Sequence, residues 1–461
     1  MSPPNGSKRS MTPPTPAPES GFAGRLLWGV LLFFYQAGWL ASGLVILGAR
    51  LLTRRPVVAI RSRLGWYSAP VRERLAQMER PIWLHMVSVG EVIAARPLIE
   101  ALRARFPERS WVFTTVTPTG QKMARKMVRE GKDLLLYLPW DLGPVVRRVI
   151  GWIRPALFLC LETELWPVLF TMLNRRGVPI VIVNGRVSPR ALRRYLWVRP
   201  FMQRLLSRVA VVMAQSPQDA RRYASIGAAK DRIVVTGNLK WDLETFEGQG
   251  APSGRVVRTE LGVAPDQLLW TAGSTHPGEE PMLLRTYGEL KRSFPMLRLL
   301  IAPRHPERSD RIEGLAQRMG FSVQRRSRTT NGAAAGGDSI LLLDTLGELN
   351  AVYAASDLVF VGGSLVPWGG HNLVEPAARR RAILTGPHLQ NFQAISEALI
   401  QAQAIAVVPN ATELSSMTAR FLRDPALRSR LGEQAFRVIE AHRGALDRTV
   451  GWIAGRYPAA G

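Results

Sequence analysis

The sequence predicts two doubly wound α/β domains, each built on a parallel sheet, preceded by one apolar N-terminal helix. Its 461 residues allow two to three folding units. Short apolar runs alternate with amphipathic stretches along most of the chain, and a break containing Gly, Pro and Ser at 247–254 divides this alternation into two series. We therefore expect an N-terminal Rossmann-like domain over 56–246 and a C-terminal one over 255–461.

Strands are expected at the short apolar runs. In the first domain these are 82–87, 111–116, 156–161, 179–183, 209–214 and 233–236. In the second they are 268–272, 297–302, 339–343, 358–361, 382–384 and 404–408. Helical segments such as 92–105 separate them, which is the rhythm of a parallel sheet. Open α/β sheets bind ligands at the carboxyl ends of their strands, and two such domains facing each other across a cleft form the architecture called GT-B among glycosyltransferases.

An apolar segment near the N-terminus predicts a transmembrane anchor. No charged side chain occurs over 26–49, which meets the roughly 20 residues needed to cross a bilayer. The alternative is a cleaved signal peptide, but its apolar region usually has about 7 to 15 residues. The basic residues favour cytoplasmic domains, because Arg50, Arg54, Arg55, Arg61 and Arg63 follow the segment whereas Lys8, Arg9 and Arg25 precede it. The Pro-rich residues 1–25 are expected to be disordered.

Composition narrows the class of ligand without choosing one. The formal net charge of +26 favours polyanions, which include nucleic acid, anionic phospholipid and phosphorylated substrates. Cys160 is the single cysteine, so no intramolecular disulfide is possible, and its apolar surroundings predict an inert core residue. The six histidines lack close metal-ligand spacing and no Asp-x-Asp pair occurs, so we expect metal-independent chemistry without a cofactor.

Ser88 and Glu91 follow the first expected strand and allow two interpretations. Ser-x-x-Glu before a helix is a capping box, in which each side chain satisfies a free backbone amide. Alternatively, Glu91 beside Gly90 is a general base that takes a proton from an acceptor hydroxyl. Both interpretations can hold together.

A second acidic group follows the strand at 156–161. In an extended segment Glu162 and Glu164 point the same way, and two nearby carboxylates need cations or hydrogen bonds to offset their repulsion. Lys240 and Arg304 are possible partners. The alternative is a pair of solvated loop acids.

A glycine-rich segment at 362–376 marks an expected strand-to-helix transition. Its glycines and the following helix N-terminus favour an anionic phosphate, and Glu375 suits a nucleotide ribose. The segment is neither a Walker A sequence nor a Gly-x-Gly-x-x-Gly fingerprint, which disfavours P-loop enzymes and simple dinucleotide oxidoreductases.

These motifs together resemble the 3-deoxy-D-manno-octulosonic acid (Kdo) transferases, family 30 of the glycosyltransferases. Seven ordered motifs carry the resemblance: His85 to Glu91, Thr115 to Gly120, Glu162 to Pro167, Thr236 to Lys240, Pro303 to Arg308, Asp344 to Leu349, and Gly362 to Leu365 with Gly369 to Asn372. Trp368, where the family often has a basic residue, Gly185, Pro189 and Arg379 to Arg381 depart from the family pattern.

The resemblance implies roles for particular residues. Glu91 is implied as the general base, and Glu162 and Lys240 as groups that stabilise the transition state. CMP contacts are implied for Pro303, Arg304, Leu346, Gly347, Glu348, Asn372, Leu373, Val374 and Glu375. The donor would be CMP-Kdo and the acceptor a phosphorylated lipid A precursor (lipid IVA) in lipopolysaccharide core biosynthesis. The family has an N-terminal anchor and works at the cytoplasmic side of the inner membrane.

The expected reaction is a single inverting displacement, in which Glu91 deprotonates an acceptor hydroxyl as CMP leaves the anomeric carbon. A GT-B transferase that uses a UDP-sugar is the rival enzyme. A membrane-tethered nucleic-acid-binding protein is the rival from another class, and it is disfavoured because no recognised nucleic-acid motif occurs and the basic residues are spread along the chain.

Overall fold

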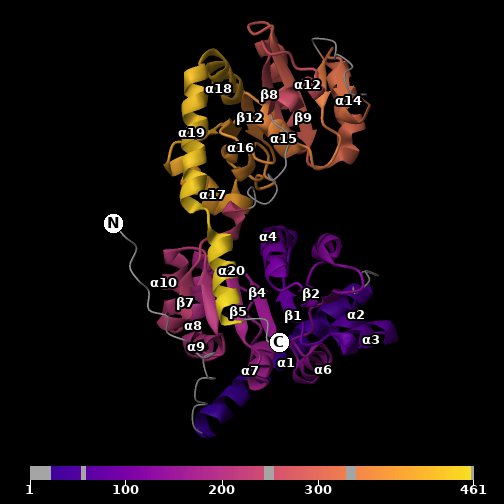
Figure 1. Cartoon of the computed structure of the whole chain (residues 1–461), viewed down its shortest axis with the longest axis vertical. Coiled ribbons are helices and arrows are strands. Elements are labelled where there is room, and N and C mark those ends of the chain that lie inside the picture. Colours follow the sequence, from indigo (N-terminus) through magenta and orange to yellow (C-terminus); the bar gives the residue numbers. More distant parts are fainter. Residues whose placement is uncertain (1–21, 53–58, 243–253, 329–338, 458–461) are drawn as a thin grey trace. The chain divides into compact units, whose positions relative to one another are not determined.

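The computed structural model describes residues 22–52, 59–242, 254–328 and 339–457. It divides into two compact units, Met1–Asp242 with Gly444–Gly461 and Leu243–Arg443. Over the described ranges each unit contains a seven-stranded sheet whose neighbouring strands are parallel (Figure 1). The prediction of two parallel α/β domains is confirmed. The predicted tail up to residue 21 and most of the 247–254 break lie outside the described residues.

The first sheet has the strand order β3-β2-β1-β4-β5-β6-β7. Its strands are β1 (Ile82–His85), β2 (Trp111–Thr115), β3 (Leu134–Tyr137), β4 (Leu157–Leu161), β5 (Ile180–Gly185), β6 (Val211–Ala214) and β7 (Ile233–Val235). Six of them match predicted runs, whereas β3 was not predicted. The central strands read as continuous apolar runs because helices cover both faces of the sheet.

Two groups of helices cover the first sheet. Helices α3 (Ala69–Gln77), α6 (Gly143–Ile153), α7 (Pro167–Arg175) and α9 (Arg199–Leu206) contribute buried side chains to one core, and α4 (Val89–Arg105) to the core on the other face. The remaining elements of this part of the chain are α2 (Ile60–Arg63), α5 (Pro118–Ala124), η1 (Arg125–Met127), α8 (Pro189–Trp197), α10 (Pro217–Ser225), η2 (Lys230–Arg232) and η3 (Leu239–Trp241).

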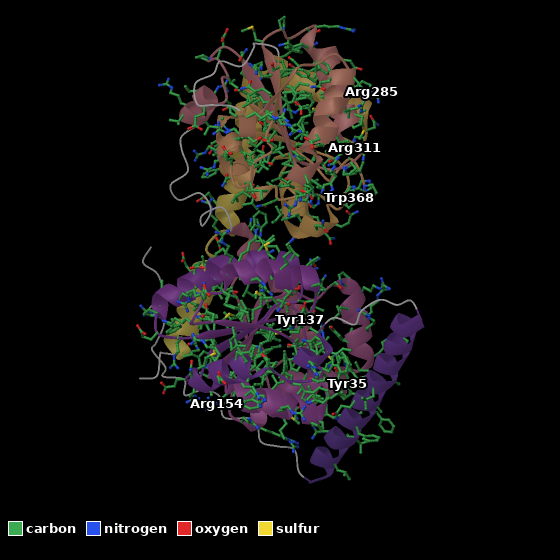
Figure 2. All side chains as sticks on the ribbon, turned by 90° about the vertical axis from the view of Figure 1, so that its right-hand side faces the viewer. Tyr35, Tyr137, Arg154, Arg285, Arg311 and Trp368 are labelled. Carbon is green, nitrogen blue, oxygen red and sulfur yellow. The ribbon has the colours of Figure 1, made fainter. Side chains whose placement is uncertain are left out.

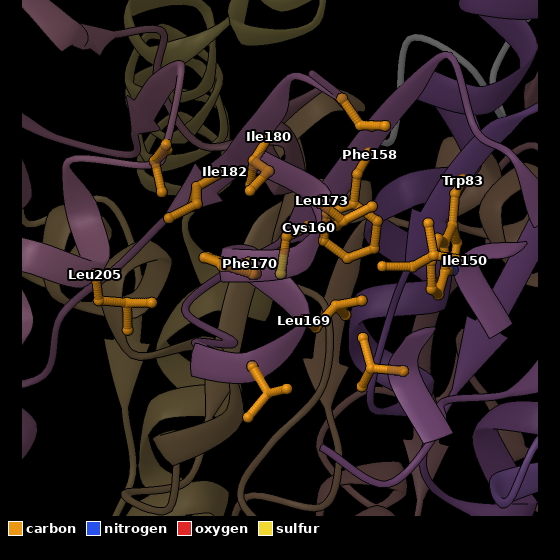
Figure 3. Close-up of a cluster of buried hydrophobic side chains, with 14 of the residues drawn as sticks. Trp83, Ile150, Phe158, Cys160, Leu169, Phe170, Leu173, Ile180, Ile182 and Leu205 are labelled. Atoms are coloured by element: carbon orange, nitrogen blue, oxygen red, sulfur yellow. The ribbon is translucent and has the colours of Figure 1, made fainter. Parts of the chain in front are cut away.

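Cys160 lies within the first of these two cores. Figure 3 shows its sulfur among apolar side chains that include Phe158, Leu169 and Phe170. Burial raises the pKa of the thiol well above its usual value, which leaves little thiolate. The prediction of a buried core cysteine is confirmed.

The last helix, α20 (Ala445–Arg456), belongs to the first unit (Figure 1). The prediction that the second domain runs through residue 461 is therefore wrong. Both carboxylate oxygens of Asp242 accept hydrogen bonds at the start of α20, from the Gly444 N–H at 2.8 Å and the Leu446 N–H at 2.7 Å. Ile453 is buried in the core beneath α4, so burial of apolar surface holds the helix in place.

Helix α1 (Phe22–Leu52) covers the segment predicted as a transmembrane anchor. One face packs on the rest of the first unit. Trp28 is 3% exposed and its indole N–H donates to the Thr171 hydroxyl at 3.3 Å, while the Gly143 N–H donates to Gln36 at 2.7 Å. Tyr35 lies on the same packed side (Figure 2). Among the described residues no helix combines the length and the apolar character needed to cross a bilayer, so the predicted transmembrane helix is not confirmed.

The second sheet has the order β10-β11-β9-β8-β12-β13-β14. Its strands are β8 (Leu268–Thr275), β9 (Leu297–Pro303), β10 (Val323–Arg325), β11 (Ile340–Leu342), β12 (Leu358–Val361), β13 (Ala382–Thr385) and β14 (Ala406–Val407). Six coincide with predicted runs, and the short β10 was not predicted. Since β9, β8 and β12 are neighbours, the segments that follow them begin at one edge of the sheet.

Helices also cover both faces of the second sheet. Buried side chains of α13 (Glu280–Lys291), α14 (Ser309–Arg318), α18 (Ala411–Arg423) and α19 (Pro425–His442) form one core, and α12 (Gly254–Glu260) and α15 (Leu349–Ala355) contribute to the other. The remaining elements of the described part of this unit are η4 (Pro306–Arg308), η5 (Arg326–Arg328), α16 (Val374–Ala378), η6 (Gln390–Phe392) and α17 (Gln393–Gln401).

Candidate active site

Glu91 lies in the first turn of α4, directly after β1, and the structure shows the predicted cap. The Ser88 hydroxyl oxygen accepts the Glu91 N–H at 3.4 Å, and the Glu91 carboxylate accepts the Ser88 hydroxyl at 3.0 Å and the Val87 N–H at 2.8 Å. The carboxylate is held by two of these hydrogen bonds, and the residue is 7% exposed. This geometry fixes the carboxylate without using all of its lone pairs.

Burial raises the pKa of Glu91 from 4.5 to about 7, and the negative charge of Glu162 adds to the effect. Burial likewise raises the pKa of Glu164 to about 7, with the charges of Glu91 and Glu162 as further causes. Three carboxylates after neighbouring strands β1 and β4 therefore interact with one another. A carboxyl group that titrates near neutrality is matched to general base catalysis, so the capping role and a catalytic role are compatible.

Glu162 is paired with Lys240, as the sequence had allowed. The Lys240 ammonium lies 3.2 Å from Glu162 Oε1, and both side chains are partly exposed, at 20% and 26%. Glu162 adopts a left-handed backbone conformation with φ 55°, so the expected extended segment through Glu164 is wrong. Such a conformation is unfavourable for a side chain with a Cβ atom and is typical of functional positions.

Two asparagines that sequence reasoning missed hold Lys240 in place. Lys240 lies on η3, where the Asn238 side chain accepts the Lys240 N–H at 3.0 Å. Buried Asn184, itself left-handed with φ 58°, accepts the Leu239 N–H at 3.0 Å. Asparagine tolerates the left-handed conformation, which is the one signal the sequence held for Asn184. This signal does not identify Leu239, 55 residues away, as its hydrogen-bond partner.

In the second unit, Arg304 follows β9 and its backbone N–H donates to Thr275 O of β8 at 3.0 Å. The Arg304 side chain is exposed, and no hydrogen bond or ion pair of its guanidinium occurs within the described ranges. Pro303 is buried as the last residue of β9. Arg304 is thus available to an anion at this edge of the sheet.

The first part of the glycine-rich segment, Gly363 to Leu365, is not the open phosphate cradle that we predicted. Its backbone N–H groups point at Glu279, which the sequence analysis overlooked: Gly363 donates at 2.7 Å, and Ser364 and Leu365 each at 3.0 Å. The His276 N–H donates to the same carboxylate at 2.9 Å. These amides are satisfied within the protein and do not await a ligand.

The other predicted CMP contacts lie in two loops of the second unit. In the first loop Leu346 is 76% exposed and Gly347 has a left-handed backbone with φ 92°. Glu348 forms an ion pair with Arg326, at a distance of 2.8 Å. In the second loop the Asn372 amide donates to Glu375 Oε1 at 2.9 Å while its oxygen accepts the Val374 N–H at 3.0 Å. Leu373 is fully buried. Asn372 and Glu375 are the polar residues of this second loop whose side chains can form hydrogen bonds with a ligand.

The departures from the family pattern at Gly185, Pro189 and Arg379 to Arg381 have structural explanations. A Cβ at Gly185 would lie 3.0 Å from the Tyr223 ring, so glycine leaves room for that buried side chain. Pro189 stands at the first turn of α8, where its missing N–H costs nothing. The three arginines contact neighbouring elements rather than a pocket: Arg379 binds Asn350, Arg380 lies over Phe436 and beside Glu433, and Arg381 donates to Ala354 O.

Within the described ranges, no group of three or more His, Cys, Asp and Glu side chains is arranged to hold a metal ion. The first unit offers a carboxylate of raised pKa beside a Glu–Lys ion pair. The second unit offers exposed polar loops and Arg304, which has no ion-pair partner in the part of the chain that the structure describes. These are the groups that acid–base catalysis and the binding of a phosphate ester require.

Comparisons with known proteins agree with this chemistry. The family model described as 3-Deoxy-D-manno-octulosonic-acid transferase (kdotransferase) matches residues 59–243. The chain is 37% identical to 3-deoxy-D-manno-octulosonic acid transferase of Haemophilus influenzae, across 80% of this chain and 85% of that protein. It is 33% identical to the transferase of the same name from Bordetella pertussis, across 81% and 87%.

The fold has a counterpart among solved structures. A glycosyltransferase from Rickettsia africae superposes with a TM-score of 0.51 at 12% identity, covering 83% of this chain and 100% of that one. This likeness concerns the fold alone, and it agrees with the GT-B class predicted from the two series of strands. Sequence identity with the curated relatives, which extends over both units, shows more: the chain is a glycosyltransferase that belongs to the 3-deoxy-D-manno-octulosonic acid (Kdo) transferase family.

Proposed function

We propose that this chain transfers Kdo from CMP-Kdo to a phosphorylated lipid A precursor, lipid IVA, in lipopolysaccharide core biosynthesis. The observation that carries the proposal is the carboxylate of Glu91, buried and of raised pKa, beside the Glu162–Lys240 ion pair in a chain of this family. A sugar hydroxyl is a weak nucleophile, and a base that titrates near pH 7 is suited to activate it.

The proposed reaction is one inverting displacement. Glu91 accepts the proton of the acceptor hydroxyl while that oxygen bonds to the anomeric carbon of Kdo. The bond from this carbon to the CMP phosphate oxygen breaks with its electron pair, and CMP leaves. Lys240, paired with Glu162 at 3.2 Å, supplies a fixed positive charge for the transition state. The chemistry needs no metal in this scheme, because side-chain cations balance the developing negative charge.

The donor is proposed to bind the second unit. Among the described residues the Arg304 guanidinium has no ion-pair partner, and it can form charge-assisted hydrogen bonds with a phosphodiester. The loops at Leu346 to Glu348 and at Asn372 to Glu375 would contact the nucleoside, and Glu375 could accept a ribose hydroxyl. Support for these contacts comes from the family resemblance and from the exposed position of Leu346.

We also propose that the protein works at the cytoplasmic surface of the inner membrane. On α1 the side chains that face outward are large and apolar, with Phe33 and Phe34 each 67% exposed. Trp197 at the end of α8 is 91% exposed and follows Arg193 and Arg194. Apolar side chains among basic residues suit the interface of an anionic bilayer. Flotation with anionic and neutral vesicles tests this, and equal recovery with both would contradict it.

A direct assay tests the enzymatic proposal. Purified protein is incubated with CMP-Kdo and tetraacylated lipid IVA, with and without EDTA, and the lipid is analysed by mass spectrometry. We expect a mass increase that corresponds to added Kdo, unaffected by EDTA, and inhibition by CMP but not by UDP. Inhibition by UDP alone would overturn the donor assignment, and a loss of turnover in EDTA that Mg²⁺ restores would overturn metal independence.

A further inference from the structure

Two histidines outside the predicted site form a hydrogen-bonded pair in the second unit. His276 follows β8, His371 follows β12, and their Nε2 atoms lie 2.8 Å apart. The ring planes make an angle of 9° with centroids 5.0 Å apart. Because one Nε2 must donate and the other accept, the two imidazoles share a proton.

Gly363 and Trp368 surround the two imidazole rings. Gly363 has φ 66°, and a Cβ there would lie 2.9 Å from the His371 ring and 3.2 Å from the His276 ring. The same glycine donates its N–H to Glu279, so the carboxylate fixes the loop that makes room for both rings. Trp368, 54% exposed, stacks on His276 with centroids 4.6 Å apart.

One polar atom of the pair lacks a partner. His276 is 5% exposed, and its Nδ1 is buried without a hydrogen bond among the described residues. An unsatisfied buried polar atom costs free energy, and a ligand that forms a hydrogen bond with it would offset that cost.

The charges near the pair are mostly positive. Burial lowers the pKa of His276 to about 4, with His305, Arg308 and Arg304 as further causes. Burial also lowers the pKa of His371 to about 3, with His276, Arg304 and His305 adding to it. Both rings are neutral at pH 7, and a bound anion would oppose the repulsion that keeps them so.

Two carboxylates also lie near the pair. Glu279 is fully buried, and its oxygens are taken up by the four backbone amides described above. Glu280 is paired with Arg308 at 2.9 Å. Within the described ranges neither carboxylate accepts a hydrogen bond from an imidazole nitrogen of the pair, so that an acceptor for the Nδ1 atoms has to come from a ligand.

We propose that the His276–His371 pair is an anion subsite of the second unit, which takes up one proton from solvent when a sugar-nucleotide phosphodiester binds beside Arg304. In this proposal the imidazole pair binds the anion, and the backbone amides of Gly363 to Leu365 do not, because they donate to Glu279. The neutral pair has two N–H protons on four ring nitrogens, and one of these lies between the two Nε2 atoms. One added proton lets both Nδ1 atoms donate and gives the pair a positive charge while the Nε2–Nε2 bond is kept.

The inference rests on the proposed CMP-sugar donor, and calorimetry separates the two. The probe is cytidine 5′-(methyl phosphate), a stable phosphodiester whose charge stays constant near neutrality. Titrations at about pH 6 and about pH 8, each in buffers of different ionisation enthalpy, give the number of protons taken up per ligand. We expect uptake approaching one proton at the lower pH and affinity about tenfold weaker at the higher pH.

Variants assign the proton to the pair. His371→Asn and His276→Asn should abolish uptake and bind the probe equally at both pH values, with His371→Gln as a second replacement should one variant fail to fold. His442→Asn on α19 is the matched control and should behave as the unchanged protein. His305→Asn removes the neighbouring exposed imidazole and should retain uptake.

The outcomes distinguish the two proposals. If the unchanged protein does not bind the probe, the CMP-sugar donor itself is wrong. If it binds without exchanging protons, or if uptake survives both pair variants or disappears in His305→Asn, the donor stands and the imidazole subsite is refuted.

Discussion

Replacing Glu91 with glutamine separates its two roles. Glutamine keeps an oxygen that accepts the Val87 N–H, so the cap of α4 is retained, but it cannot take a proton from the acceptor. We expect turnover to fall by about two to four orders of magnitude. The folded protein should gain stability, because the variant no longer carries a buried carboxylate whose pKa is raised from 4.5 to about 7.

The size and sign of the stability change follow from linkage. A raised pKa in the folded state means that Glu91 is favoured there as the neutral acid, so its contribution is fully present below pH 4.5 and is lost as pH rises through about 7. The difference between these values corresponds to about 3 kcal/mol. Glu91→Gln should thus be more stable than the unchanged protein at pH 8, and the advantage should vanish in acid.

Two measurements test this reasoning. Mass spectrometry of the lipid product gives turnover, and urea denaturation at about pH 5 and about pH 8 gives the free energy of unfolding. Glu91→Ala, which also loses the cap, serves as the comparison and should be less stable than Glu91→Gln. Full turnover in Glu91→Gln would leave Glu91 as a cap alone, and a pH-independent stability difference would refute the raised pKa.

The other predictions concern three further side chains. Lys240→Met removes the cation 3.2 Å from Glu162 and should lower kcat by about two orders of magnitude with little change in KM; unchanged kcat in steady-state assays would exclude its role. Arg304→Gln should weaken CMP binding at least about tenfold by calorimetry, whereas exposed Arg292→Gln should not, and equal affinities would exclude the guanidinium contact. Cys160 should react with a thiol reagent only after denaturation, and rapid labelling of the native protein would contradict its burial.

Local patterns in the sequence predicted much of the fold. Strands such as β4 and β12 are continuous apolar runs, because helices cover both faces of a parallel sheet. Strand β10 was missed because its partly buried Val-Gln-Arg sequence at the edge of the sheet forms no apolar run. Strand β3, also at an edge, does form an apolar run, and it was overlooked. The capping box at Glu91 was readable because both of its partners lie within four residues.

Contacts between distant residues were less readable. The pairing of Lys240 with Glu162 was offered only as a possibility, because it spans 78 residues and depends on the left-handed turn at Glu162. The glycine loop was misread for the same reason: its partner Glu279 lies 84 residues from Gly363. Spacing rules describe neighbours in a helix or strand. They do not indicate which distant loop donates hydrogen bonds to a buried carboxylate.

The return of α20 to the first unit has a consequence for synthesis on the ribosome. The chain is made from its N-terminus, and domains generally fold as their residues emerge. Here the first unit lacks α20 until the whole second unit has been translated, and meanwhile Asp242 and the apolar face that receives Ile453 stay without their partners. The second unit, continuous over 243–443, has its full sequence before the first unit does. The order in which the units are completed is therefore the reverse of the order in which they begin.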